Sequence, residues 1–226
     1  MKIGIIGYGK MGKAIEKMAL YHGHVIILKI NSKNTHELNT KTLSDIDIAI
    51  EFSTPTSAFK NISFCLMNNT PVISGTTGWI EKIDEIRILC EQQKGAFLYA
   101  ENFSIGMNIF FQLNNYLAQL MIATDYKLQI EETHHASKKD TPSGTAIKIQ
   151  SDLNKSFKKD DIIPIKSNRI GNIRGEHAVE YFSEFDSIHI KHTAHNREGF
   201  AKGVILATEF LKNKTGVFSM RDVIKN

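Results

Sequence analysis

An apolar strand, a glycine-rich turn and a helix follow one another directly at the start of this chain. Residues 2–6 are predicted as the strand, Gly7-Tyr-Gly-Lys-Met-Gly12 as the turn and residues 13–21 as the helix. A G-x-G-x-x-G turn in this position lets the backbone approach a pyrophosphate, whose charge meets the positive end of the helix. The pattern predicts a dinucleotide-binding sheet; a glycine-rich turn of another α/β protein is the alternative.

Strands and helices go on alternating at short spacing after this turn. Strands are expected at residues 25–30, 47–52, 71–74 and 96–100, and helices at 56–68 and 80–92. Such alternation is typical of a doubly wound parallel sheet, which binds ligands at the carboxyl ends of its strands. Three of these ends run into small or polar turns: Ser53-Thr-Pro55, Gly75-Thr-Thr-Gly78 and Asn102-Phe-Ser104. Each is an ordinary turn if taken alone, but together they favour a binding site.

The alternation stops at a long helix predicted for residues 106–123. Strands are then expected at 126–132, 162–165, 177–182 and 188–192, with helices at 146–153 and 200–211 and a strand or helical turn at 217–224. We therefore predict an α/β protein with an N-terminal Rossmann-type doubly wound parallel sheet at residues 1–104, completed by 198–226. Residues 105–197 are expected to form a second, α+β domain with an open mixed sheet.

Composition and charge exclude several classes of protein. The formal charge of +4 is spread along the 226 residues without a long basic block, so nucleic acid is not an expected partner. No apolar run approaches the roughly 20 residues that span a bilayer, so no membrane partner is expected. Because a strand is predicted directly at its start, we expect no signal peptide. Cys65 and Cys90 have no metal-ligand spacing. We expect a cytoplasmic enzyme.

The residues after the second predicted strand bear on the choice of cofactor. A site dedicated to NAD usually has an acidic residue there that binds the ribose 2′-hydroxyl. This chain has Asn31-Ser-Lys-Asn34 instead, and Lys33, with Lys10 in the glycine turn, could attract a 2′-phosphate. We predict that NADPH is used at least as well as NADH. The alternative is that both lysines are ordinary solvated side chains.

Residues 131–146 join a predicted strand to a predicted helix and hold the most reactive side chains of the chain. In Pro142-Ser-Gly-Thr-Ala146, Ser143 is a candidate N-cap of the helix. The amides of Gly144 and Thr145, with the Thr145 hydroxyl, would then form a carboxylate pocket at the positive end of the helix. An ordinary capped helix is the alternative.

Two adjacent histidines and a lysine precede this turn. A histidine titrates near neutral pH and can protonate a carbanion-like or enamine intermediate, and Lys138 can bind a second carboxylate or give up a proton. His134 and His135 alternate sides if the strand persists, so only one need face the substrate directly. We do not expect a metal, because no third ligand has a recognisable spacing, although Glu131, Glu132 and Asp140 are nearby.

These motifs resemble the signature of the 4-hydroxy-tetrahydrodipicolinate reductase (dihydrodipicolinate reductase) family of lysine and diaminopimelate biosynthesis. The resemblance extends along most of the chain. The residues that carry it are His134-His-x-x-Lys138-x-Asp-x-Pro-Ser-Gly-Thr-Ala146, Gly-Lys-Met-Gly12, Glu51-Phe-Ser-Thr-Pro55, Gly75-Thr-Thr-Gly78, Asn102-Phe-Ser-x-Gly-x-Asn108, Arg169-x-Gly-x-Ile-x-Gly-Glu-His177 and Phe218-Ser-Met-Arg-Asp222.

The resemblance implies a reaction and a division of labour. It implies hydride transfer from NADH or NADPH to C4 of a cyclic imine dicarboxylate, with loss of water, by a homotetramer assembled through the middle domain. His134 is implied as the general acid and Lys138 as its partner. Substrate carboxylates would be bound by His135, Lys138, Gly144, Thr145 and Arg197. The implied cofactor-binding residues are Gly7, Gly9, Lys10, Met11, Gly12, Ser32, Lys33, Ser53, Gly75, Thr76, Thr77, Asn102 and Phe103.

The chain departs from the commoner family pattern in several places. The glycine turn is one residue shorter, Lys10 replaces the usual Arg before Met, Ala136 replaces the usual Arg after the two histidines, and the chain is short for the family. Two other hypotheses remain: a dehydrogenase of similar layout acting on an amino-acid semialdehyde, and a non-catalytic dinucleotide sensor. The sensor has no need of the His-His-x-x-Lys stretch.

Overall fold

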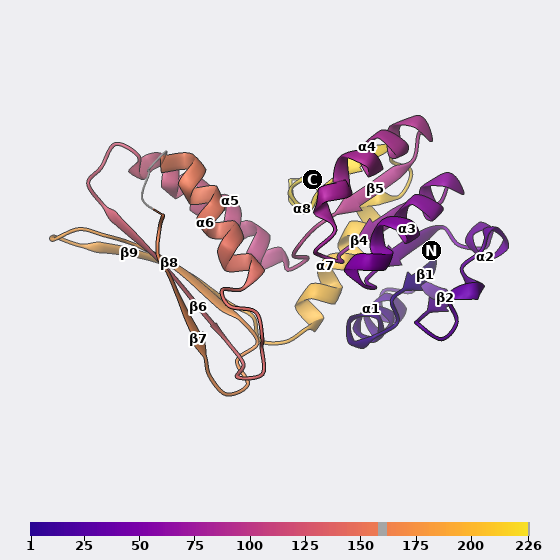
Figure 1. The fold of residues 1–226 in the computed structure, drawn as a ribbon, viewed down its shortest axis with the longest axis horizontal. Coiled ribbons are helices and arrows are strands. Elements are labelled where there is room, and N and C mark those ends of the chain that lie inside the picture. Colours follow the sequence, from indigo (N-terminus) through magenta and orange to yellow (C-terminus); the bar gives the residue numbers. More distant parts are fainter. Residues whose placement is uncertain (158–161, 226) are drawn as a thin grey trace. The chain divides into compact units, whose positions relative to one another are not determined.

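A computed structural model describes residues 1–157 and 162–225 of the chain. These residues form two compact units, one of residues 1–105 with 197–225 and the other of residues 106–157 with 162–196. Each unit has a sheet of its own (Figure 1). Among the described residues, no helix is both long and apolar enough to cross a bilayer.

The first unit is built on a six-stranded sheet in the order β10-β5-β4-β3-β1-β2. Every pairing in it is parallel. Its strands are β1 (Lys2–Ile6), β2 (Val25–Ile30), β3 (Ile48–Glu51), β4 (Val72–Ser74), β5 (Ala96–Tyr99) and β10 (Gly216–Phe218). The strand order reverses beside β1, which is the point where such sheets bind dinucleotides.

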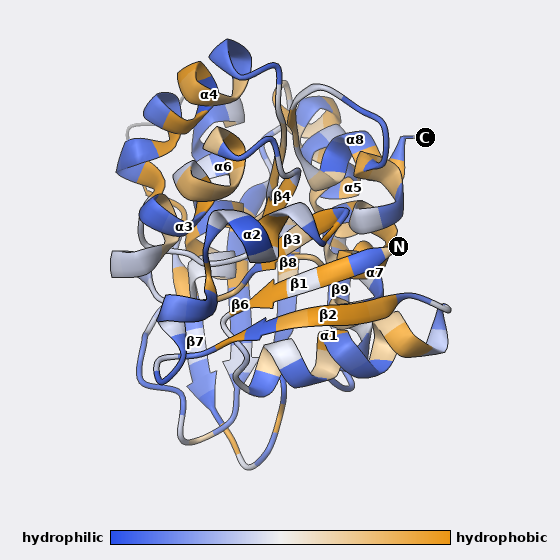
Figure 2. Cartoon of the chain, turned by 90° about the vertical axis from the view of Figure 1, so that its right-hand side faces the viewer, coloured by the Kyte–Doolittle hydropathy of each residue, from blue (hydrophilic) through white to orange (hydrophobic). Residues whose placement is uncertain are grey.

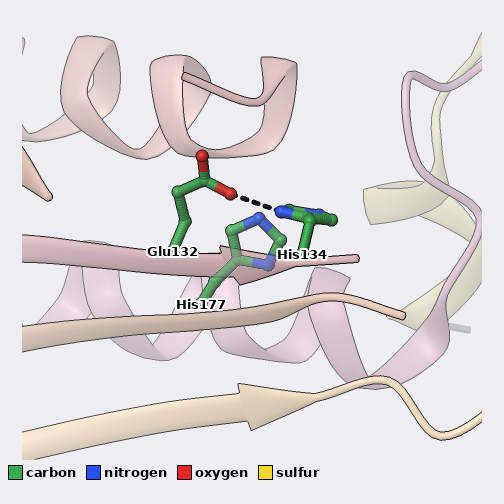
Figure 3. A group of neighbouring side chains, drawn as sticks. All are labelled: Glu132, His134 and His177. Atoms are coloured by element: carbon green, nitrogen blue, oxygen red, sulfur yellow. Dashed lines mark hydrogen bonds and ion pairs between the residues drawn. The ribbon is translucent and has the colours of Figure 1, made fainter. Parts of the chain in front are cut away.

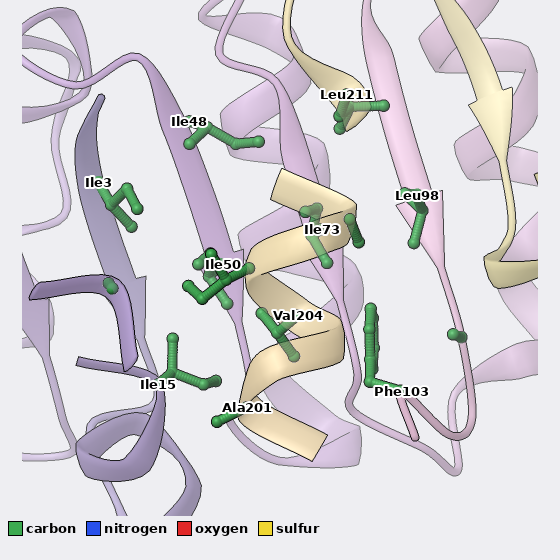
Figure 4. Close-up of a cluster of buried hydrophobic side chains, with 14 of the residues drawn as sticks. Ile3, Ile15, Ile48, Ile50, Ile73, Leu98, Phe103, Ala201, Val204 and Leu211 are labelled. Carbon is green, nitrogen blue, oxygen red and sulfur yellow. The ribbon is translucent and has the colours of Figure 1, made fainter. Parts of the chain in front are cut away.

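Helices cover both faces of this sheet because its strands are apolar on both sides. Ile3, Ile48 and Ile50 belong to one buried cluster, with Ile15 of α1 (Lys10–Tyr21) and Val204 of α7 (Glu198–Leu211) (Figure 4). The opposite face buries a second cluster against α2 (Thr40–Ser44), α3 (Pro55–Met67) and α4 (Ile83–Gln92). Two 3-10 turns (Thr35–Glu37 and Ile80–Lys82) and α8 (Met220–Ile224) complete the unit.

The second unit holds a four-stranded mixed sheet in the order β7-β6-β8-β9. Its strands are β6 (Lys127–His134), β7 (Ile165–Arg169), β8 (Glu176–Phe182) and β9 (Ser187–Thr193). β7 runs parallel to β6, whereas β8 and β9 are antiparallel to their neighbours. Its apolar face packs against α5 (Ile105–Met121) and α6 (Gly144–Phe157). The other face is more polar, so the unit has two layers.

The predicted fold class is confirmed, and one strand was placed wrongly. We expected a strand at 162–165, but β7 begins at Ile165 and runs on through Lys-Ser-Asn to Arg169. β7 pairs with β6 only and forms an edge of the sheet. An edge strand can have a polar sequence, and this polarity is why the strand was not predicted at residues 165–169. In Figure 2, β7 is coloured hydrophilic, whereas β1 and β2 are mostly hydrophobic. The region expected as one strand or turn near 217–224 forms both β10 and α8.

Candidate active site

The alternation of β6 places two ionisable side chains on the buried face of the second sheet. Leu128 and Ile130 belong to the apolar core, and Glu132 and His134 continue the same row toward the end of the strand. Glu132 is fully buried and His134 is 8% exposed. A buried carboxylate must be paired, because leaving it unpaired in a protein interior is very unfavourable.

Glu132 is paired on both of its carboxylate oxygens. Its Oε2 accepts a short hydrogen bond from Nδ1 of His134, seen as the dashed line in Figure 3. Its Oε1 lies 2.9 Å from Nη2 of Arg169 and accepts a hydrogen bond of 3.3 Å from the amide of Ser143. Burial raises the pKa of the Glu132 carboxyl, but the bonds from Arg169 and His134 outweigh it and hold the pKa below its ordinary value. Glu132 is therefore ionised.

His177 completes this cluster from the neighbouring strand. The antiparallel register places it directly opposite Glu132, and its ring lies edge-on to that of His134 with 5.1 Å between centroids. Its Nε2 is 3.1 Å from the hydroxyl of Ser143. Burial, together with the charge of His134, lowers the pKa of His177 to about 3. His177 is thus a neutral, structural partner.

Nδ1 of His134 is bonded to Glu132, so only Nε2 is available for proton transfer. Because Glu132 is an ionised acceptor, Nδ1 of His134 carries the proton of their hydrogen bond. Nε2 lies beside Gly175, where an added methyl group would stand 3.1 Å from it. Burial lowers the pKa of His134, as do the charges of Lys138 and Arg169, while Glu132 raises it. Nε2 is therefore the nitrogen that exchanges a proton.

The turn before α6 has the structure expected for an anion site. Ser143 caps the helix, since its Oγ accepts a hydrogen bond of 3.2 Å from the amide of Ala146. Gly144 is exposed and Thr145 is half-buried, and a side chain added at Gly144 would meet no atom within 4 Å. The first turn of a helix leaves its amides without intrahelical acceptors. This turn can therefore bind a carboxylate.

The loop between β6 and α6 carries the other two predicted residues. Lys138 forms an ion pair of 2.8 Å with Asp140, and Nδ1 of His135 lies 2.8 Å from the hydroxyl of Ser137. Arg169 ties the same loop down by bonding the carbonyl of Asp140 at 2.7 Å. His134, Lys138 and the helix start thus belong to one hydrogen-bonded network of side-chain and backbone groups.

Glu132, His134 and His177 also have the composition of a metal site, since their ligand atoms lie within 4.8 Å of one another. Each of the three is already engaged in a hydrogen bond. The guanidinium of Arg169 lies 2.9 Å from Glu132 and opposes a second cation there. The arrangement fits a proton-holding network better than a metal site.

The first unit contains a cavity of about 800 Å³ at the carboxyl ends of its strands. Its lining includes the predicted residues Gly7, Gly9, Ser32 and Ser53. Gly7 has φ of +99°, and a side chain there would meet the carbonyl oxygen of Phe52 at 2.1 Å. A backbone pressed so closely to its neighbours, beside a helix N-terminus, fits a pyrophosphate. The residues present therefore suit a dinucleotide.

The cavity has no acidic side chain in its described lining, as expected from the sequence after β2, which has no Asp or Glu at residues 31–34. Among the described lining residues, His36 and Lys60 are the basic ones. Sequence reasoning did not single out either of them. Lys33 and Lys10, which it did single out, are exposed and lie outside the lining.

The remaining predicted cofactor residues lie at the start of α1 and in the turns that follow β4 and β5. Met11 and Gly12 are in the first turn of α1, and Gly12 is buried. Gly75, Thr76 and Thr77 follow β4, and Asn102 and Phe103 follow β5. The ring centroids of Phe103 and Phe52 are 5.6 Å apart. Gly75 would clash with the Phe52 ring if it carried a side chain.

The structure places one predicted residue outside this cluster and adds three residues that were not predicted. Arg197, predicted to bind substrate, is the exposed N-cap of α7 and belongs to the first unit. His177 and Arg169 were noted only as parts of a motif, and Glu132 only as a neighbour. The row Leu128-x-Ile-x-Glu-x-His134 contains the missed signal, because its period of two places Glu132 in a core position.

Comparisons with known proteins agree along the whole chain. The family model described as "Dihydrodipicolinate reductase, N-terminus" matches residues 1–103, and "Dihydrodipicolinate reductase, C-terminus" matches residues 106–224. The 4-hydroxy-tetrahydrodipicolinate reductase of Christiangramia forsetii is 43% identical over 100% of this chain and 98% of its own. The enzyme of the same name from Thermosipho africanus is 36% identical, with the same coverage.

Solved structures with the same fold include two informative neighbours. A dipicolinate-bound dihydrodipicolinate reductase from Paenisporosarcina sp. TG-14 has a TM-score of 0.83 and 22% identity over 98% of both chains. Aspartate semialdehyde dehydrogenase II from Vibrio cholerae has a TM-score of 0.56 and 11% identity, over 93% of this chain and 97% of its own. At these identities the likenesses establish the fold alone.

Proposed function

This chain belongs to the dihydrodipicolinate reductase family, and we propose that it catalyses the NADH- or NADPH-dependent reduction of 4-hydroxy-tetrahydrodipicolinate. The products would be tetrahydrodipicolinate, oxidised cofactor and water, in lysine and diaminopimelate biosynthesis. The observation that carries the proposal is the buried proton donor His134, which the side chain of Glu132 links to the turn that starts α6. One unit thus provides both a proton and an anion site.

The substrate is a dicarboxylate, and the second unit has places for its charges. The amides of Gly144 and Thr145 and the Thr145 hydroxyl would bind one carboxylate at the positive end of α6. His135 and Lys138 would bind the other. Lys138 is paired with Asp140 in the structure, so we propose that it exchanges this partner for the substrate.

Loss of water from the substrate leaves a ring in which a carbon–carbon double bond is conjugated with the imine. A reduced nicotinamide supplies the hydride that C4 of this ring accepts. Hydride addition at C4 leaves a nucleophilic enamine. His134 then donates a proton from Nε2 to the ring carbon next to C4, which restores the imine. Burial of His134 removes competing water, and Lys138 assists by holding the anionic substrate against it.

The residues that line the first unit's cavity suit either cofactor. The proposed cofactor-binding set remains the one predicted from the sequence, with Gly7, Gly9, Ser32 and Ser53 in the lining. The absence of a carboxylate from the described lining supports use of NADPH at least as well as NADH, because nothing there repels a 2′-phosphate. His36 and Lys60 would add attraction.

An assay with freshly prepared substrate and each cofactor in turn tests the proposal. We expect oxidation of NADPH and NADH that depends on this substrate, with inhibition by dipicolinate. Oxidation of NADPH without dependence on the substrate, or turnover of an amino-acid semialdehyde in its place, would favour the dehydrogenase alternative. Cofactor binding without any turnover would favour the sensor.

We further propose that the enzyme works in the cytoplasm as a homotetramer assembled through its second domain, as the family resemblance implies. Analytical ultracentrifugation of the full chain tests the assembly. A sedimentation coefficient that corresponds to a 25.5 kDa monomer would contradict the homotetramer.

A further inference from the structure

The Glu132 side chain contacts residues of three elements around the candidate proton donor. It bonds Nδ1 of His134 on its own strand, lies 2.9 Å from Nη2 of Arg169 on β7 and accepts from the amide of Ser143 at the start of α6. Yet it is fully buried, so it does not meet solvent or substrate directly. A fully buried carboxylate acts through the groups that it holds.

We propose that Glu132 is a positioning residue of the reaction: it fixes His134 through Nδ1 so that Nε2 carries the transferred proton, and it ties this donor to the carboxylate-binding turn through Ser143. This inference rests on the proposed function. In the step itself, the Nε2–H bond of the imidazolium breaks and a C–H bond forms on the substrate ring. Glu132 stays ionised throughout, and solvent later returns the proton to Nε2.

The charges around His134 come from every element that packs on it. Glu132 on β6 favours the imidazolium, whereas Lys138 of the following loop and Arg169 of β7 oppose it. His177 on β8 is neutral and faces the same ring. Glu132 is thus the only anion that acts on His134 among those described. Removing its charge lowers the pKa of His134, which leaves less imidazolium at neutral pH.

The test compares Glu132→Gln with Glu131→Gln. Glu131 is the adjacent residue on β6, faces the other side of the sheet and is bonded to Asn168 and Lys166, so it receives the same chemical change away from His134. We expect the limb on which kcat falls with rising pH to move by about one unit to lower pH in Glu132→Gln, with about a tenfold loss at neutral pH. Because Gln keeps an oxygen for the Ser143 amide, KM should change little.

Recovery of kcat toward the wild-type value at acidic pH separates this role from a structural one, since a damaged fold is not repaired by acid. A limb that stays in place in Glu132→Gln, or moves equally in Glu131→Gln, would overturn the proposal. Absence of turnover by the wild type would instead contradict the proposed function.

Nitrogen NMR of histidine in the wild-type chain decides the positioning role without a variant or a substrate. We expect Nδ1 of His134 to stay protonated in the neutral ring while Nε2 titrates. A neutral ring protonated on Nε2 would contradict the role of Glu132, whatever reaction the protein catalyses.

Discussion

His177 lies directly opposite Glu132 in the antiparallel pairing of β6 with β8, so a neutral imidazole and an ionised carboxylate share one buried cross-strand pair. The pair lies where the apolar rows of both strands end. Its burial gives the fold of the second unit a dependence on pH as well as a place for the proton donor.

His177 should make the chain less stable in acid. Its pKa is about 3 when folded, against about 6.5 in an unfolded chain. Between these values the unfolded state binds one more proton, so the free energy of unfolding falls by about 1.4 kcal/mol for each unit of pH lost. In His177→Gln, denaturant titrations between pH 6 and 4 should show a shallower fall. The exposed His189 on β9, changed to Gln, provides the control, and equal slopes in all three proteins would contradict the prediction.

Replacing His134 should affect the chemical step. We expect His134→Gln to lower kcat roughly a hundredfold or more while KM changes little, because proton donation matters mainly in the transition state. His135→Gln should instead raise KM, since His135 is proposed to bind a carboxylate. Steady-state kinetics of both variants distinguish the roles, and a near-normal kcat for His134→Gln would refute the first.

Thr145→Val tests the carboxylate pocket at the start of α6. Valine keeps the shape of threonine but loses its hydroxyl, and a hydrogen bond to a charged group contributes about 1.5–3 kcal/mol. KM should therefore rise roughly tenfold or more, with a smaller change in kcat. Ser151→Ala, a loss of an exposed hydroxyl further along the same helix, should leave KM as it is. An unchanged KM for Thr145→Val would count against the pocket.

The basic residues near the cofactor cavity should favour NADPH. Lys60→Met and Lys33→Met are each expected to weaken binding of NADPH several-fold more than binding of NADH, because only NADPH carries the 2′-phosphate that these positive charges would attract. Fluorescence titration with both cofactors measures the ratio, and Lys41→Met on α2 is the control. If neither variant alters the ratio, the cofactor preference has another source.

Gly203 allows α7 to pack closely against the turn that follows β5. A methyl group at this position would lie 1.7 Å from the carbonyl oxygen of Phe103, so the helix would have to move. Gly203→Ala should therefore destabilise the chain by about 3 kcal/mol or more, although alanine favours helices. Gly199→Ala on the same helix meets no atom within 4 Å and should be neutral or mildly stabilising. Thermal unfolding of both variants makes the comparison, and similar midpoints would contradict it.

The sequence allowed most of the first unit to be predicted because its signals are local. The G-x-G-x-x-G turn and the alternation of strands and helices each lie within a few residues of the element they specify. The same holds for Ser143, whose capping role depends on the three residues after it. These predictions needed no knowledge of which strands pair.

The proton network could not be predicted in that way, because its members meet through sheet pairing. His177 reaches Glu132 only by the register of β8 on β6, and Arg169 reaches it only because β7 runs parallel to β6. The polar sequence of β7 hid the strand that carries Arg169. Glu132 itself looked like an ordinary charged residue of a solvated strand, since a buried carboxylate is uncommon without its partners.

We propose above that a hydride from the reduced nicotinamide reaches C4 of the substrate while His134 protonates the neighbouring carbon. Both steps can be followed by turnover of freshly prepared 4-hydroxy-tetrahydrodipicolinate with cofactor deuterated at the transferred position, and NMR of the product. We expect tetrahydrodipicolinate with one deuterium at C4, formed by the wild type and far more slowly by His134→Gln. Product without deuterium at C4, or no product from the wild type, would contradict the proposal.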